Sequence, residues 1–303
     1  MRVAVLGATG MLGSAVLEVF KDAPEIGLRV TSREGVLGMA PPGIEVATLD
    51  ASAGSRSDLI RVLDDCDWAV NCIGLIKHRI QDHQRDSTER AVRVNALFPH
   101  ILANAAQETG CSVLQIATDC VYSGAKGSYI ESDPHDAIDV YGKSKSLGEV
   151  CAPGMHHLRC SIIGRELKDH RSLLDWFLGH PQGARIQGFS NHLWNGVTTL
   201  HFARICLGVI REGIVLPHLC HVVPEDVLPK GDLLKVFRQA FGREDLQVDL
   251  HPAPQAVDRS LATSDTALNH RLWASAGYSA PPTLAGMVTE LAERTHSGKR
   301  WHA

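Results

Sequence analysis

The sequence lacks any apolar run that approaches the roughly 18 residues needed to span a bilayer. Its first apolar segment, residues 2–6, ends at Gly7 and is too short for the apolar core of a signal peptide. Neither sign of charge dominates, because 30 Lys and Arg residues stand against 34 Asp and Glu residues, a formal charge of −4. No global positive field would hold nucleic acid or an anionic membrane. We therefore expect a soluble cytoplasmic protein with no nucleic-acid or membrane partner.

The sequence also lacks a C-x-x-C pair, although it contains eight cysteines. Several of them lie in apolar runs such as residues 70–73, which predicts buried, reduced thiols. His218, Cys220 and His221 are the densest group of possible metal ligands, but no second ligand cluster accompanies them. We predict no metal site.

Strand-like and helix-like segments alternate through the first half of the 303-residue chain. At about 150 residues per domain, this length suggests about two domains. Apolar runs predict strands at residues 2–6, 28–31, 46–49, 68–73, 112–117 and 157–163. Helical spacing predicts helices at residues 13–21, 57–63, 89–109 (with a kink at Pro99) and 140–151. Strands separated by helices predict right-handed crossovers and a parallel sheet.

The alternation loosens after Gly164, and the later chain mixes both kinds of segment. The pattern predicts a helix at 197–210, a strand at 214–223, and helices at 231–241 and 282–295. We expect an α/β protein, with a Rossmann-type doubly wound parallel sheet and a smaller mixed α/β substrate lobe. The expected sheet domain is 1–164 with 196–223 returning to it, and the expected lobe is 165–195 with 224–303.

A glycine-rich loop, G-A-T-G-M-L-G, follows the first predicted strand and opens the first predicted helix. Glycines permit a tight turn there and a close approach of the backbone to a pyrophosphate at the helix N-terminus. A plain strand-to-helix turn would use glycine too, but the position inside a βαβ pattern favours dinucleotide binding. The cofactor-binding candidates are Gly7, Thr9, Gly10, Met11, Leu12 and Gly13.

Further cofactor contacts are expected where the next strands end. An acidic residue after the second strand would bind the ribose hydroxyls of NAD, whereas Ser32 and Arg33 suit a 2′-phosphate and favour NADP(H) over NAD(H). Asp50 could contact the adenine, and a helix-capping role is nearly as good an interpretation. Three residues at the end of the fourth strand could face the adenosine ribose, or simply form a turn: Cys72, Ile73 and Gly74.

Thr118, Tyr141 and Lys145 form the most specific pattern in the sequence. Tyr141 and Lys145 are four residues apart and so share one face of a predicted helix. The Lys145 ammonium could lower the pKa of the phenol and also bind the nicotinamide ribose. The phenol could then exchange a proton with a carbonyl or alcohol oxygen, to which Thr118 donates a second hydrogen bond. A Y-x-x-x-K pattern alone is common, but its position downstream of the glycine loop predicts a catalytic triad.

Taken together, these motifs resemble the extended branch of the short-chain dehydrogenase/reductases, and within it the dTDP-4-dehydrorhamnose reductase-like group. The resemblance is sharp over about residues 1–165. It rests on G-A-T-G-M-L-G at 7–13, R-V-N-A at 93–96, A-T-D-C-V-Y at 117–122 and Y-G-K-S-K-S-L-G-E at 141–149. Two departures, Ile162 at a family tryptophan position and the bulky N-H-L-W-N at 191–195, concern the sugar side. The metal-binding carboxylates of some members have no clear match.

The resemblance implies an NAD(P)H-dependent enzyme that reduces the 4-keto group of a nucleotide-linked deoxysugar, as in deoxysugar and polysaccharide biosynthesis. It implies substrate contacts from Cys120, Val121, Tyr122, Trp194, Asn195 and Arg259. For three of these residues a purely structural role stays open. Tyr122 could be a loop residue, Trp194 could pack between the lobes, and Arg259 could form a surface ion pair. We also expect Asn95 to play a structural role, and a homodimer stays open.

The length of the later chain suggests a wall for a large anionic substrate. Candidates for contact with a diphosphate are Arg165, Arg185, Asn195 and Arg259. Two other functions remain. A sugar-nucleotide epimerase or dehydratase with a retained cofactor would carry an acidic residue at the end of the second strand, where this sequence has Ser32 and Arg33. A non-catalytic, cofactor-binding regulatory subunit would have an eroded triad.

Overall fold

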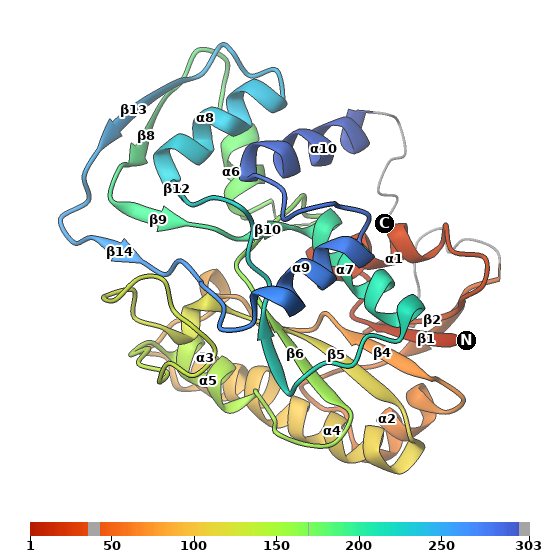
Figure 1. The fold of residues 1–303 in the computed structure, drawn as a ribbon. Coiled ribbons are helices and arrows are strands. Elements are labelled where there is room, and N and C mark those ends of the chain that lie inside the picture. Colours follow the sequence, from red (N-terminus) through yellow and green to blue (C-terminus); the bar gives the residue numbers. More distant parts are fainter. Residues whose placement is uncertain (36–42, 169, 297–303) are drawn as a thin grey trace.

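A seven-stranded parallel sheet forms the centre of the computed structural model, which describes residues 1–35, 43–168 and 170–296 (Figure 1). The strand order is β11-β6-β5-β4-β1-β2-β3. The strands are β1 (Arg2–Leu6), β2 (Gly27–Ser32), β3 (Glu45–Thr48), β4 (Trp68–Asn71), β5 (Ser112–Ala117), β6 (Met155–Arg159) and β11 (Leu219–His221). The order reverses direction between β1 and β4, so a crevice opens at their carboxyl ends. This confirms the predicted Rossmann-type sheet.

Helices cover both faces of this sheet (Figure 1). On one face α1 (Met11–Phe20) and α7 (Thr199–Glu212) pack against apolar side chains such as Val5 and Val30. On the other face α2 (Arg56–Leu63) and α4 (Phe98–Thr109) pack against Leu6 and Ala69. Strands buried on both sides explain why the sequence shows continuous apolar runs at these positions.

The long helix predicted at residues 89–109 is divided into three parts. These are α3 (Arg85–Ala91), a π-helical segment η2 (Val92–Leu97) and α4, which has Pro99 in its first turn. A proline has no N–H to donate, and the wider π turn accommodates it. The segment also packs on the end of α5 (Val140–Leu147), because a Cβ at Gly148 would meet the Asn95 carbonyl oxygen at 1.9 Å. The predicted helix 140–151 therefore ends at Leu147.

Short elements of the later chain form a second lobe beside the carboxyl ends of the central strands (Figure 1). Its strands are β7 (Ile162–Ile163), β8 (Arg185–Phe189), β9 (His192–Trp194), β10 (Val197–Thr198), β12 (Leu228–Pro229), β13 (Gln247–His251) and β14 (Val257–Asp258). Its helices include α6 (Leu173–Leu178), α8 (Lys230–Ala240), α9 (Thr266–Ser275) and α10 (Leu284–His296). The pairings are β10-β7, β12-β9-β14 and β13-β8.

Two predicted boundaries are wrong in this region. The strand predicted at 157–163 is split into β6 and β7, and the one predicted at 214–223 is confined to Leu219–His221. β11 pairs with β6 in the central sheet, and α7 packs against α1 on one face of that sheet. The chain therefore returns to the central sheet after it has entered the second lobe. The proposed division into 1–164 with 196–223, and 165–195 with 224–303, stays a prediction. No helix in the described part of the chain is long and apolar enough to cross a membrane.

Candidate active site

A cavity of about 440 Å³ lies where the carboxyl ends of the central strands meet the second lobe. Its wall includes residues 10–12 of the glycine loop, residues 116–120 at the end of β5, and the side chains of Tyr141 and Lys145. Apolar and polar atoms from the later chain complete it, including Trp194, Lys230 and Arg259. The cavity therefore brings together the motifs that the sequence places far apart.

The glycine loop is tight because its glycines approach neighbouring atoms closely. Gly7 has φ +82°, and a Cβ there would meet Cγ1 of Ile73 at 2.7 Å. A Cβ at Gly13 would meet the Gly7 carbonyl oxygen at 2.1 Å. Gly10, the N-cap of α1, lines the cavity with Met11 and Leu12. Gly7 and Gly13 thus shape the loop, and the backbone N–H groups at the start of α1 are available to an anionic ligand.

The expected adenosine-side residues lie at the ends of β2, β3 and β4. Ser32 ends β2, and Arg33 follows it on the surface. Asp50 accepts hydrogen bonds from the Ser52 backbone N–H (2.9 Å) and hydroxyl (2.7 Å), which hold the pKa of its carboxyl below its ordinary value. The helix-cap interpretation of Asp50 is wrong, since Ser55 caps α2. After β4, Cys72 and Gly74 line the cavity.

Thr118, Tyr141 and Lys145 all line the same cavity. Thr118 directly follows β5, and its hydroxyl accepts from the Cys120 backbone N–H at 3.2 Å. Tyr141 lies in the first turn of α5. The Lys145 Nζ, on a residue that is only 7% exposed, donates to the Ile116 carbonyl oxygen at 3.1 Å. The three side chains that the sequence predicted as a triad are therefore brought to one place.

Burial dominates the electrostatics of the two titratable triad members. It raises the pKa of the Tyr141 phenol well above its ordinary value, and a hydrogen bond with Thr118 opposes the shift only in part. Burial lowers the pKa of the Lys145 ammonium, and the charge of Glu149 opposes that shift. We expected Lys145 to lower the pKa of the phenol. In the structure the main effect on this pKa is burial, which raises it, and the lysine ammonium donates to a backbone carbonyl instead.

Asn95 joins the loop after β4 to α5, the helix that carries Tyr141 and Lys145. Its Oδ1 accepts from the Leu75 backbone N–H at 2.8 Å, and its Nδ2 donates to the Leu75 carbonyl at 2.9 Å. Nδ2 also contacts the Ser144 hydroxyl at 3.2 Å. The side chain is buried, so all of these bonds form away from water. Asn95 has the expected structural role.

On the substrate side, some predicted residues reach the cavity and others do not. Cys120, Trp194 and Arg259 line it. The predicted substrate contacts of Val121 and Tyr122 are not found at the cavity, because both residues are fully buried in a separate apolar cluster. There the Tyr122 hydroxyl donates to the Ile130 carbonyl.

Three further candidates from the later chain do not line the cavity and have other partners. The Asn195 amide is occupied by both backbone groups of Leu261, at 2.7 and 2.8 Å. Arg165 pairs with Asp175 through an N–O contact of 2.5 Å, and Arg185, an exposed residue of β8, donates to the side-chain oxygen of Gln247 on β13 at 2.9 Å. Of the cations expected to hold a diphosphate, Arg259 is the one that reaches the wall of the cavity.

Sequence reasoning missed several cationic residues of the cavity. Lys230, the first residue of α8, lines the wall with Arg259. Lys77 also lines the cavity, begins a short 3-10 helix, η1 (Lys77–Arg79), and pairs with Asp139 at 2.6 Å. No sequence motif marks these positions, because they face the cavity only through the packing of the second lobe and the loop after β4.

The fold and the triad define the class of the protein as an extended short-chain dehydrogenase/reductase, built on a Rossmann-type sheet. Residues 1–162 match the family described as the RmlD substrate binding domain. The chain belongs to this family.

Known proteins of related sequence and structure agree with this assignment. The dTDP-4-dehydrorhamnose reductase of Burkholderia thailandensis is 29% identical over 207 residues, 61% of this chain and 62% of that protein. The methionine adenosyltransferase 2 subunit beta of Danio rerio is 31% identical over 172 residues, 55% of this chain and 49% of that protein. The chain thus spans less than two thirds of these relatives.

A solved structure shows the same fold over nearly the whole chain. The dTDP-4-dehydrorhamnose reductase from Bacillus anthracis, in complex with NADP, has a TM-score of 0.73 and 16% identity, and the match covers 97% of this chain and 99% of that one.

Proposed function

We propose that this protein is an NAD(P)H-dependent reductase that transfers a hydride to the 4-keto group of a nucleotide-linked deoxysugar. The observation that carries the proposal is the single cavity that holds the glycine loop, the three triad side chains and the cations Lys230 and Arg259. The same activity is named for the Burkholderia thailandensis relative. The proposed preference for NADP(H) over NAD(H) rests on Arg33 after β2 alone, because solved structures of the same fold hold NADP in one case and NAD in others.

The residues present fit a dinucleotide. The close contacts of Gly7 and Gly13 leave no room for a Cβ at either position, so the loop folds tightly, and a pyrophosphate could approach the backbone at the start of α1. When bound, the nicotinamide supplies the hydride that reduces the carbonyl carbon. Arg33 and Ser32 would meet the 2′-phosphate, and Lys145 would contact the nicotinamide ribose.

In this proposal the protein's own residues handle the proton. Tyr141 donates its phenolic proton to the sugar's carbonyl oxygen as that carbon gains the hydride, so the product is an alcohol and the tyrosine is left as a phenolate. Thr118 donates a hydrogen bond to the same oxygen and stabilises its developing negative charge. The Lys145 ammonium stabilises the phenolate until solvent returns the proton.

The competing interpretations are weaker on the same residues. An epimerase or dehydratase that retains NAD would favour an acidic residue at the end of β2, where this chain has Ser32 and Arg33. A non-catalytic subunit is suggested by the name of the Danio rerio relative, but a triad that lines one cavity is what a catalyst needs.

The direct test is NADPH oxidation followed at 340 nm with a panel of nucleotide-linked 4-keto-6-deoxysugars. The expected result is turnover with at least one member, which falls by roughly a hundredfold or more in a Tyr141→Phe preparation. If the protein binds NADPH but oxidises it with no member of the panel, the interpretation as a non-catalytic, cofactor-binding subunit would be favoured.

A further inference from the structure

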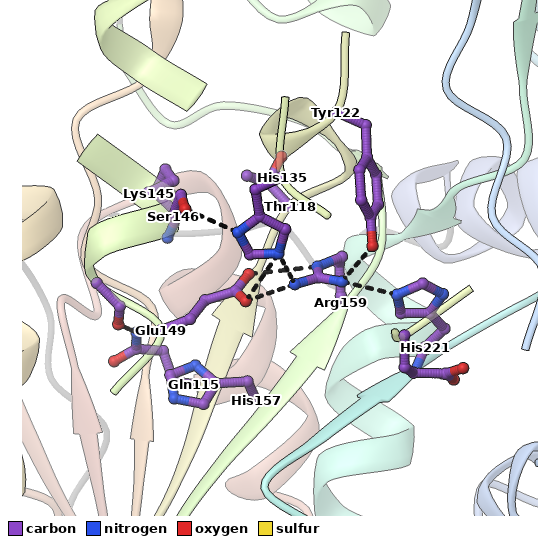
Figure 2. A network of polar contacts seen from close by, with 12 residues as sticks. Gln115, Thr118, Tyr122, His135, Lys145, Ser146, Glu149, His157, Arg159 and His221 are labelled. Atoms are coloured by element: carbon purple, nitrogen blue, oxygen red, sulfur yellow. Dashed lines mark hydrogen bonds and ion pairs between the residues drawn. The ribbon is translucent and has the colours of Figure 1, made fainter. Parts of the chain in front are cut away.

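A buried arginine, Arg159, lies in a network of polar contacts close to Thr118 and Lys145, and the proposed reaction gives it no role (Figure 2). It ends β6, where it is the register partner of Ala117, the residue that precedes Thr118. Its side chain is 0% exposed. An ionised group removed from water in this way is costly unless its hydrogen-bonding groups all find partners.

Each of the five N–H groups of this guanidinium has an acceptor. Nε donates to Oε1 of Glu149 at 3.2 Å, and Nη2 donates to Oε2 of the same carboxylate. Nη1 donates to the Tyr122 hydroxyl at 2.6 Å and contacts Nε2 of His221 at 2.9 Å. Nη2 also contacts Nε2 of His135 at 2.7 Å. Because an arginine offers five donors and accepts none, this set uses its capacity fully.

The two imidazoles must accept through Nε2, which fixes their tautomers. Each then donates through Nδ1: His135 to the Ser146 hydroxyl at 2.7 Å, and His221 to the Ala262 carbonyl at 2.6 Å. Both rings are therefore neutral in this arrangement. Burial lowers the pKa of His221 to about 4 and lowers that of His135 as well, which agrees with the neutral forms.

The partners of Arg159 belong to the segments that carry the triad. Tyr122 lies four residues after Thr118, so its hydroxyl ties down the turn that the threonine begins. Glu149 lies just beyond the end of α5, four residues after Lys145. His135 precedes α5 and reaches Ser146 on that helix. One guanidinium thus fixes the turn after β5 relative to the last turn of α5 (Figure 2).

We propose that Arg159 and Glu149 act as positioning residues, a buried ion pair that holds Lys145 and Thr118 in the arrangement that the Tyr141 proton transfer requires. This inference rests on the proposed reductase function. It goes beyond a structural role, because the Glu149 carboxylate is also the charge that favours the protonated form of Lys145 against the effect of burial. Loss of the carboxylate should therefore change the titration of Lys145 as well as the geometry.

The variants are Glu149→Gln, which keeps the shape and removes the charge, and Arg159→Lys, which cannot make the two-pronged contact. The matched control is Arg29→Lys. Arg29 is also a buried arginine, at 7% exposure, but its Nη1 bonds the backbone carbonyls of Val62 and Asp64 at the far side of the sheet.

We expect Glu149→Gln to fold, to bind NADPH within about threefold of the wild type and to keep a similar KM. Its kcat should fall about a hundredfold, the effect of misplacing reacting groups by roughly an ångström. Arg29→Lys should lower the melting temperature but leave kcat unchanged. In a Tyr141→Phe background, Glu149→Gln should have little further effect on kcat, because the two changes impair the same step. Independent, multiplicative losses in that double variant would overturn the proposal.

A second measurement does not need the substrate. ¹³C NMR of lysine-labelled protein, with Lys145 assigned from Lys145→Met, should show a lower pKa for Lys145 in Glu149→Gln than in the wild type or in Arg29→Lys. An unchanged titration would overturn the positioning role whatever the substrate. If the titration shifts as expected while no 4-keto sugar is reduced, the proposed function fails and the coupling between Glu149 and Lys145 stands.

Discussion

At the scale of single residues, the environment of Tyr141 keeps its phenol protonated. A carbonyl can be reduced only if a proton reaches its oxygen, so the donor must be protonated when substrate binds. Burial raises the pKa of this phenol, and the nearby acidic groups Cys120, Asp119 and Asp139 act in the same direction. The phenol therefore stays protonated at neutral pH, and its acidity is useful only once an ammonium such as Lys145 stabilises the phenolate.

Tyr141→Phe tests this role, since it removes the proton and keeps the ring. We expect cofactor affinity to stay unchanged and kcat to fall by roughly a hundredfold to ten-thousandfold, the usual scale of general acid catalysis. Lys145→Met should weaken both turnover and cofactor binding. Steady-state kinetics and calorimetry check both variants, and near-normal turnover of Tyr141→Phe would require another proton donor.

The preference for NADPH over NADH also depends on a single residue, Arg33. A charge-assisted hydrogen bond to the 2′-phosphate contributes about 1.5–3 kcal/mol. NADPH should therefore bind roughly tenfold to a hundredfold more tightly than NADH, and Arg33→Ala should remove most of that difference. Calorimetry with both cofactors measures it. Equal affinities in the wild type would contradict a role for Arg33 and Ser32.

At the scale of elements, how well the sequence predicted each one depended on how strongly burial constrained it. The inner strands of the central sheet are buried on both faces, so their apolar runs were visible, whereas the edge strand β3 is only half-buried or exposed. β13 was missed because its five residues, Gln247–His251, are half-buried or exposed, and no period marks it. β12 and β14 have two residues each, too few for any pattern.

The same distinction applies to the candidate site. The glycine loop and Tyr141-x-x-x-Lys145 are contiguous motifs, and their positions follow from the chain. Tyr122 was wrongly assigned to the cavity because closeness in sequence to Thr118 does not fix where a side chain points. In the short 3-10 turn η3 (Asp119–Val121) the chain turns so that Tyr122 faces the interior. Lys230 lacked any signal because only tertiary packing places it on the wall.

The seating of α5 against the turn after β5 gives a prediction for this element. A Cβ at Gly142 would meet the Cys120 carbonyl oxygen at 2.3 Å and the Ala137 Cβ at 2.4 Å. Gly142→Ala should therefore displace α5, destabilise the protein by about 1–3 kcal/mol and reduce kcat. The control is Gly286→Ala in α10, where the nearest atom is a side-chain oxygen of Thr283 at 3.2 Å. Denaturant unfolding should show no loss for the control, and an equally stable, active Gly142→Ala would contradict the close seating.

At the scale of the whole molecule, buried neutral histidines link stability to pH. Burial lowers the pKa of His157 to about 3, and its residue is fully buried. The unfolded chain therefore binds a proton near pH 6.5 that the folded protein refuses until about pH 3, and stability falls as the pH drops through that window. Each such histidine contributes a slope of up to about 1.4 kcal/mol per pH unit.

His157→Gln should flatten this dependence, whatever its effect on stability at pH 7.5. The free energy of unfolding in urea, measured at pH 7.5, 6.5 and 5.5, should decline less steeply in the variant than in the wild type. His83→Gln, a change at an exposed histidine, is the matched control and should keep the wild-type slope. Parallel curves for His157→Gln and the wild type would show that this histidine is not held neutral by the fold.

The two-lobed arrangement also predicts which substrates the proposed reductase can use. The triad needs only the central sheet, yet one cavity continues from Tyr141 to Lys230 and Arg259 on the second lobe. Two cations on that wall suit the diphosphate of a nucleotide-linked sugar. Contacts so far from the reacting carbon would help to position it, so a substrate without the nucleotide should lose turnover as well as affinity.

The measurement compares kcat/KM for a free 4-keto sugar and for its nucleotide-linked form, in the wild type and in Lys230→Met. We expect a large preference for the linked form that Lys230→Met reduces, with little change for the free sugar. If the free sugar were reduced equally well, the second lobe would not recognise a nucleotide, and a reductase of simple ketones would explain the cavity better.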